Sequence, residues 1–302
     1  MSQSVDIAGL VLAKIETLGL SASADYFGVS IPTISAWRAQ KNLPNLAAGQ
    51  KILDEYFTQK PPELWDINGK KVLVLLPVYR EFSGITHVTL FRNYAVYGPD
   101  KVGLIPKFRT LIVEARNMLA SMALSTDCEF VIYCDSDQAL PCGNGAMLRS
   151  MGVNLPEPNA SYNAISRIMS HPPDKKIVGG LYFGRNDTHR AQVSSAFDSP
   201  TEDARYHKIL KDGGDYPLEE VRWVATGFMR IHRSVFETMI AESDKLFPMI
   251  KPAAAGRHWG FFTPDRPDQG EDVIFCERAK LCGIQSYLDP ALLIGHVGEK
   301  VY

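Results

Sequence analysis

Two short, continuously apolar segments constrain the fold of this chain more than any other feature. Val72–Leu76 ends at Pro77, and Phe130–Cys134 leads directly into Asp135-Ser136-Asp137. An uninterrupted apolar run of this length is typical of a strand that is buried on both faces of a parallel sheet. Helical and extended patterns alternate after them, so we expect an α/β fold with functional loops at the carboxyl ends of the strands.

The remaining elements of this region follow from apolar spacing. We expect helices at 108–124, 165–169, 235–241 and 272–282, and extended segments at 177–183, 221–231 and 284–288. The segment 140–158 is rich in Gly, Pro and Asn and has no assignment.

A domain boundary is expected at Gln59–Glu63, where two consecutive prolines stop any helix. Residues 1–58 have the apolar spacing of four or five short helices, with Gly and Ser at their ends. We therefore expect a small all-α domain over 1–58, a linker over 59–69 and the α/β domain over 70–302.

Composition excludes several classes of protein. The 302 residues include 32 Lys and Arg against 34 Asp and Glu, so no overall basic field coats nucleic acid. No apolar run approaches the roughly 20 residues that span a bilayer, and the N-terminus lacks the pattern of a secretion signal. The five cysteines contain no Cys-x-x-Cys pair. We therefore expect a soluble, cytoplasmic protein without a disulfide framework or membrane contact.

Asp135 and Asp137 are the sharpest candidates for chemistry. Alternate side chains of an extended segment point the same way, so the two carboxylates face one point. They repel each other unless a cation lies between them, and oxygen ligands suit Mg²⁺ or Mn²⁺. Because Asp also caps helices and ends strands, the pattern alone is weak, and its position after a buried strand strengthens it.

The segment Ser23–Lys41 resembles the helix-turn-helix of phage Cro and repressor proteins. The resemblance gives a packed interior of Ala24, Val29, Ile34 and Trp37. The outward residues would be Thr33, Ser35, Arg38, Gln40 and Lys41, whose groups suit base edges and phosphates. A plain helical bundle for subunit contact is the alternative, and the nearly balanced charge of residues 1–58 as a whole does not favour DNA.

Residues from about 70 to 302 resemble the nucleotide-sugar glycosyltransferases of the GT-A fold, which is Rossmann-like with a mostly parallel sheet. Motifs of that family occur in its order: Leu76–Arg80, Ala115-Arg116-Asn117, Asp135-Ser136-Asp137, Trp223–Phe228, Gly270–Cys276 and Gly295–Gly298.

The resemblance implies a donor side that binds a UDP-sugar with Mn²⁺ or Mg²⁺. The nucleotide would be held by Pro77, Tyr79, Arg80, Arg116, Asn117, Asp135 and Ser136, with Tyr79 available to stack on the base. The metal would be bound by Asp135, Asp137 and His296. An isolated histidine is often structural, and Arg116 could equally be a surface cation.

The resemblance also implies a reaction with inversion. Asp272 matches the general base of inverting members, and Glu271 would orient the base or bind sugar hydroxyls. Acidic residues at a helix start also interact favourably with the helix dipole, and this interaction alone can account for one of the two. The acceptor side would include Trp223, Thr226, Gly227, Trp259, Phe261 and Arg185, although a tryptophan such as Trp223 also suits a core.

Taken together, the two resemblances predict a phage-type glycosyltransferase that acts on DNA. Its acceptor would be a hydroxylated, 5-hydroxymethyl-type pyrimidine, exposed in the groove or flipped from the stack. Two alternatives are a glycosyltransferase for a surface glycan or protein, and a DNA-binding regulator with an inactive transferase domain.

Overall fold

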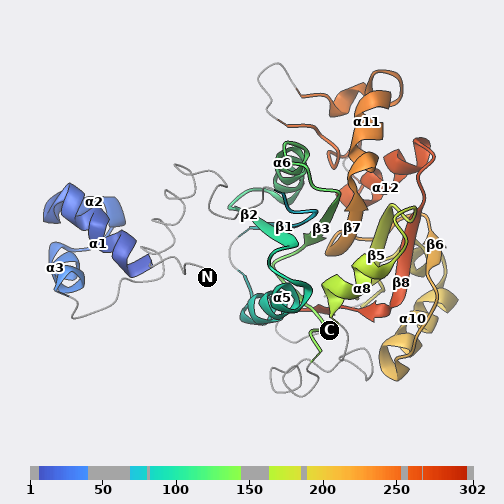
Figure 1. Cartoon of the computed structure of the whole chain (residues 1–302), viewed down its shortest axis with the longest axis horizontal. Coiled ribbons are helices and arrows are strands. Elements are labelled where there is room, and N and C mark those ends of the chain that lie inside the picture. The colour runs from blue at the N-terminus through green and yellow to red at the C-terminus, as the bar shows by residue number, and fades with distance from the viewer. Residues whose placement is uncertain are drawn as a thin grey trace. The chain divides into compact units, whose positions relative to one another are not determined.

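The computed structural model describes residues 7–39, 69–79, 82–143, 163–184, 189–252, 258–266 and 268–297 (Figure 1). The chain divides into two compact units between Leu64 and Trp65. The first unit is helical where it is described, and the second combines a sheet with helices.

Three helices form the described part of the first unit. They are α1 (Ile7–Leu18), α2 (Leu20–Phe27) and α3 (Ile31–Arg38). Gly28 ends α2 in the left-handed conformation at φ 66°, which glycine adopts without strain, and the Ser30 side chain caps α3 by accepting the Thr33 N–H. The core of this unit contains Val11, Ile15, Ala24, Ile34 and Trp37.

On α3, Ser35 and Arg38 are exposed and Thr33 is half-buried. Gln40, Lys41, the last expected helix of this unit and most of the expected linker lie outside the described residues. The helix-turn-helix identity of the unit stays a prediction.

A seven-stranded sheet in the order β2-β1-β3-β7-β5-β8-β6 forms the centre of the second unit. Its strands are β1 (Val72–Val78), β2 (Val102–Phe108), β3 (Phe130–Cys134), β5 (Ile177–Leu181), β6 (Glu219–Val221), β7 (Phe228–His232) and β8 (Ser286–Leu293). β7 and β6 pair antiparallel with their neighbours, and the other five strands point one way. The expected α/β fold with a largely parallel sheet is confirmed.

Helices cover both faces of this sheet (Figure 1). α6 (Ile112–Leu124), α11 (Arg233–Leu246) and α12 (Glu271–Leu281) pack on one face, and α5 (Gly84–Tyr97) and α8 (Ala164–Ser170) pack on the other. Leu73 and Leu75 of β1 enter the first core, whereas Val72 and Val74 enter the second. Burial on both faces explains the continuous apolar run.

Two of the remaining helices, α9 (Ser194–Asp198) and α10 (Pro200–Asp212), add buried residues to the first core, and the other remaining elements are short. They are the 3₁₀ helix η3 (Pro248–Ile250) and a small sheet of β4 (Gln138–Ala139) and β9 (Gly295–His296). This small sheet connects the acidic segment, Asp135–Asp137, which follows β3, to His296 near the end of the described chain, because Gln138 pairs with His296.

Most of the expected elements have somewhat different bounds in the structure; for example, the helix expected at 235–241 is α11 (Arg233–Leu246) and the extended segment expected at 177–183 ends at Leu181. The helix expected at 108–124 begins at Ile112, because Phe108 ends β2, a strand whose Gly103 and Pro106 interrupt the apolar signal. The extended segment expected at 221–231 is two strands, since β6 ends at Val221 and β7 begins at Phe228. The last strand continues to Leu293.

Candidate active site

The candidate site lies where the carboxyl end of β3 meets the first turn of α12. Asp135 follows β3 directly, and its backbone N–H donates to the carbonyl of Gly227 at 3.0 Å, just before β7. Glu271 and Asp272 form the first turn of α12. The carboxyl ends of parallel strands are the usual binding edge of an α/β sheet, so these residues stand where such sheets commonly bind ligands.

Arg116 is the centre of the site. Its side chain comes from α6, is 3% exposed, and donates from Nη2 to both carboxylate oxygens of Asp135 at 2.9 Å. Its Nη1 donates to Glu271. A charge this deeply buried requires paired, hydrogen-bonded partners, and the planar guanidinium suits two carboxylates at once. Arg116 therefore joins the segment after β3 to the start of α12.

The charges of these groups are strongly coupled. Burial works to lower the pKa of Arg116, but Asp135, Glu271 and Asp272 outweigh it, so the pKa rises and the guanidinium stays charged. Burial raises the pKa of Asp135, Arg116 opposes this, and nearby Asp137 adds to the rise. One arginine thus faces several carboxylates, and the edge carries an excess of negative charge.

Asp272 has the pKa of a base that works near neutrality. Burial, followed by the charge of Glu271, raises its pKa to about 6, against the opposing charge of Arg116. Its Oδ1 accepts the Val273 N–H at 2.9 Å, which keeps the carboxylate at the helix start. A carboxylate that only complemented the helix dipole would have a lowered pKa, so the shift reflects burial beside a like charge.

Asp137 and His296 form a second polar pair. Nδ1 of His296 lies 2.8 Å from the carbonyl of Phe183, which only accepts, so Nδ1 carries the hydrogen. Its Nε2 then presents a lone pair 3.5 Å from Oδ2 of Asp137, unless the ring is protonated. A lone pair and a carboxylate oxygen facing each other fit a cation placed beside them.

The donor atoms at this edge fit a divalent cation whose coordination shell is completed by a substrate. Within the described parts of the chain, no three His, Cys, Asp or Glu side chains stand together in ligating geometry. Asp137 and His296 are brought together, whereas the carboxylate of Asp135 is directed at Arg116. Mg²⁺ characteristically uses one or two carboxylates together with phosphate oxygens and water, so two protein ligands suffice.

The structure changes the expectation for the helical pair Arg116 and Asn117. Neither faces the open side of the site, because they are 3% and 2% exposed. Oδ1 of Asn117 accepts the Phe262 N–H at 2.9 Å, and its Nδ2 donates to Thr263 Oγ1 at 3.0 Å. Asn117 therefore holds the loop that leads to α12.

The other donor-side residues occupy different environments. Pro77 is buried inside β1, whereas Tyr79, just after that strand, is 56% exposed and accessible to a base. The carbonyl of Ser136 accepts the Ser83 N–H at 2.9 Å and so joins the acidic segment to the start of α5. Arg80 lies outside the described residues.

The expected acceptor residues are largely enclosed. Phe261 is completely buried, so it belongs to the core and not to a binding surface. Thr226 is 1% exposed, and among the described residues its Oγ1 has no hydrogen-bond partner. Trp223 and Trp259 are half-buried and pack on Phe197 and Phe261, with ring centres 5.3 and 6.2 Å apart. Arg185 lies outside the described residues.

Arg278 and Tyr182 were missed by the sequence patterns. Arg278 is 1% exposed and donates to the carbonyls of Gly260, Phe261 and Thr263 and to Asp265, so it fixes the same loop as Asn117. An arginine in a helix gives no signal of such burial. Tyr182 follows β5 directly, and only its position at a strand's carboxyl end could have indicated the site.

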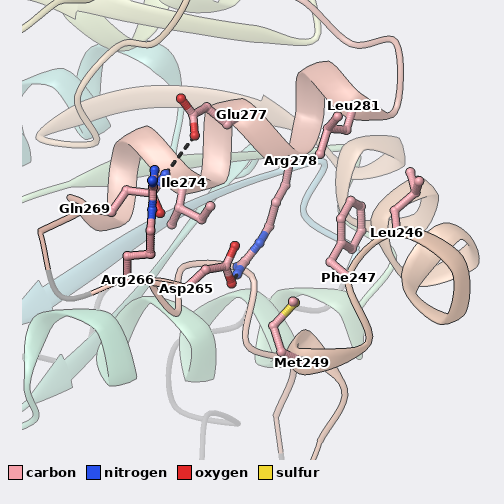
Figure 2. A pocket seen from close by; sticks show the side chains of 10 residues that line it. All are labelled: Leu246, Phe247, Met249, Asp265, Arg266, Gln269, Ile274, Glu277, Arg278 and Leu281. Atoms are coloured by element: carbon pink, nitrogen blue, oxygen red, sulfur yellow. Dashed lines mark hydrogen bonds and ion pairs between the residues drawn. The ribbon is translucent and has the colours of Figure 1, made fainter.

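A cavity of about 270 Å³ lies beside α12 (Figure 2). Asp135, Asp137, Glu271 and Asp272 are not among the residues that line it. Phe247 and Met249 form one wall, and Ile274, Arg278 and Leu281 of α12 form another. Arg278 points toward Asp265 across this space, and the two are ion-paired. Arg278 and Asp265 of the cavity lining thus pair with each other, and we assign the cavity no catalytic role.

Comparisons with known proteins identify no family. No family model matches the chain, and no curated protein matches it. Among solved structures, A197 from STIV aligns with a TM-score of 0.42 and 15% identity over 76% of this chain and 86% of that chain. A glycosyltransferase involved in the glycosylation of the major capsid of PBCV-1 aligns with a TM-score of 0.26 and 11% identity, over 58% and 68%. Likeness at this level carries no conclusion about activity.

Across the described helices, none combines the length and apolar character needed to cross a bilayer.

Proposed function

We propose that this chain is a nucleotide-sugar-dependent glycosyltransferase that inverts the anomeric configuration. One observation carries the proposal: a single buried arginine, Arg116, gathers the acidic segment after β3 and the acidic start of α12 at one edge of the sheet. Asp272, whose pKa is raised to about 6, lies in this cluster as a base suited to neutral pH.

In the proposed step, Asp272 accepts the proton of an acceptor hydroxyl. The hydroxyl oxygen then forms a bond to the anomeric carbon while the bond from that carbon to the diphosphate oxygen breaks. The nucleoside diphosphate leaves with the electron pair. A positioned base contributes a factor of about 10² to 10⁴ to such a step. Glu271, fixed by Arg116, keeps the start of α12 in place, and its charge adds to the burial that raises the pKa of Asp272.

The donor side would use Asp137 and His296 to hold Mn²⁺ or Mg²⁺, and Tyr79 to stack on the base of a UDP-sugar. A bound divalent ion supplies charge stabilisation to a departing diphosphate. Asp135 stays a predicted ligand, because Arg116 occupies both of its oxygens in the structure. The guanidinium would oppose the rise that burial causes in the pKa of Asp135.

For the acceptor, we propose a hydroxylated pyrimidine base in DNA. The support is the three-helix unit, in which Ser35 and Arg38 are exposed on α3 after a glycine turn and a serine cap. These side chains suit base edges and phosphates. A glycan or protein acceptor, and a DNA-binding protein without transfer, are the alternatives that the assay distinguishes.

The test is a transfer assay with the full chain. The protein is incubated with UDP-sugars, Mn²⁺ and a duplex containing 5-hydroxymethylcytosine, and the products are analysed by mass spectrometry. We expect a hexose or pentose adduct on the modified base. Asp137→Ala is expected to abolish both donor hydrolysis and transfer, whereas Arg38→Ala should retain hydrolysis and weaken only transfer to DNA.

Each outcome has a defined meaning. Transfer to oligosaccharides or proteins but never to DNA refutes the proposed acceptor and keeps the enzyme class. If neither transfer nor donor hydrolysis occurs with any nucleotide-sugar, the glycosyltransferase proposal is wrong.

A further inference from the structure

Tyr182 lies at the junction of the segments that build the site. It follows β5 directly and is 5% exposed. Its hydroxyl accepts the backbone N–H of Gly227 at 2.9 Å. Its ring meets the ring of His296 edge to face, with centres 5.5 Å apart and planes at 85°. The proposed transfer step does not use the hydroxyl of this buried tyrosine.

The contact with Gly227 extends to the acidic segment. The carbonyl of Gly227 accepts the backbone N–H of Asp135 at 3.0 Å, so one residue connects the phenol to the start of the acidic segment. A Cβ at position 227 would lie 2.5 Å from the Tyr182 hydroxyl and 2.8 Å from Gln138 Nε2. Only glycine permits this approach without a displacement of Tyr182 or Gln138.

The contact between Tyr182 and His296 helps to set the direction of Nε2 of His296. The next residue, Phe183, accepts the Nδ1–H of His296 through its carbonyl at 2.8 Å. Tyr182 packs against the ring of the same histidine. Two consecutive residues thus fix the tautomer and the orientation that turn Nε2 toward Asp137 at 3.5 Å. Groups that orient a ligating histidine in this way tune metal affinity in proteins.

We propose that Tyr182 is a positioning residue for divalent-cation binding at Asp137 and His296. This role rests on the proposed function, because it concerns the cation of that site. The phenol adds no negative charge to the acidic edge, since burial, and then the charges of Asp135 and Asp272, raise its pKa well above the ordinary value. It acts on the ligands through Gly227 and the ring contact.

The test measures Mn²⁺ affinity directly, by titration calorimetry of the full chain, first alone and then with UDP present to supply phosphate oxygens. Tyr182→Phe removes only the hydroxyl, and we expect the dissociation constant for Mn²⁺ to rise about 10-fold, at the low end of the usual range of about 10- to 100-fold for such partners. The matched control is Tyr206→Phe, a completely buried tyrosine that loses its bonds to Ser195 and Glu219. We expect this control to bind Mn²⁺ like the wild type.

Gly227→Ala tests the same contact through its other partner, because the added methyl group must displace Tyr182 or Gln138. We expect a similar loss of Mn²⁺ affinity. Wild-type affinity in Tyr182→Phe, or an equal loss in Tyr206→Phe, overturns the positioning role alone. Absence of Mn²⁺ binding by the wild type, both alone and with UDP present, overturns the proposed cation site and this role with it.

Discussion

Replacing Asp272 by asparagine should slow transfer about 10²- to 10⁴-fold and at the same time stabilise the protein at neutral pH. Folding raises the pKa of Asp272 from 3.8 to about 6, because burial and Glu271 disfavour the charged form. The folded state therefore holds the proton more tightly than the unfolded state. The stability that this proton contributes is complete below pH 3.8 and is lost as the pH rises through about 6.

The magnitude follows from the shift. A rise of about 2 pKa units, at about 1.36 kcal/mol each, gives an upper value of about 3 kcal/mol for the cost of the ionised carboxylate above pH 7. The amide oxygen of the substituted side chain would still accept the Val273 N–H, which lies 2.9 Å from Oδ1 of Asp272 in the wild type, without carrying the charge. Asp272→Asn should thus be more stable than the wild type by up to this amount at pH 8, and the difference should vanish near pH 4.

Urea unfolding of the full chain at pH values from 4 to 8 checks this prediction. The control is Asp268→Asn, which changes an exposed aspartate in the loop before α12 and should show no comparable pH-dependent difference. If Asp272→Asn is no more stable than the wild type at pH 8, or if its advantage is the same at every pH, the electrostatic account of Asp272 is refuted.

Three further outcomes follow from the same site. Arg116→Met leaves Asp135 and Glu271 without their buried cation and should cost about 3 to 5 kcal/mol of unfolding free energy in urea; a cost below about 1 kcal/mol contradicts the account. In transfer kinetics, kcat/KM should decrease as the pH falls below about 6, because Asp272 must be ionised to accept a proton; a flat profile from pH 5 to 8 argues against it. Arg278→Leu removes the donors from several loop carbonyls and should cost at least about 2 kcal/mol; unchanged thermal stability opposes this.

The apolar runs predict the centre of the sheet because the physics there is simple. Strands β1 and β3 are buried on both faces, so every position must be apolar and the pattern is unmistakable. Helix α5 was missed for the opposite reason. Its buried side includes Thr86, Thr89 and Asn93, which are hydrogen-bonded, so the apolar period that identifies a helix is absent.

The site was only partly predictable for a related reason. The sequence places Asp135 after a strand and Asp272 at a helix start, and the topology then brings both to one edge. The direction of Arg116 is a tertiary property, because nothing in the spacing of α6 distinguishes a surface cation from a buried one. The same holds for Tyr182, whose contacts with Gly227 and His296 join segments far apart in the sequence.

The central claim is that the acidic edge beside Arg116 binds a nucleoside diphosphate through a divalent cation. Titration calorimetry of UDP with and without Mn²⁺, on the wild type and on Asp137→Ala, tests it most directly. We predict UDP binding that requires Mn²⁺ and is lost in the variant. Equal UDP affinity without Mn²⁺, or equal affinity in Asp137→Ala, would contradict the claim.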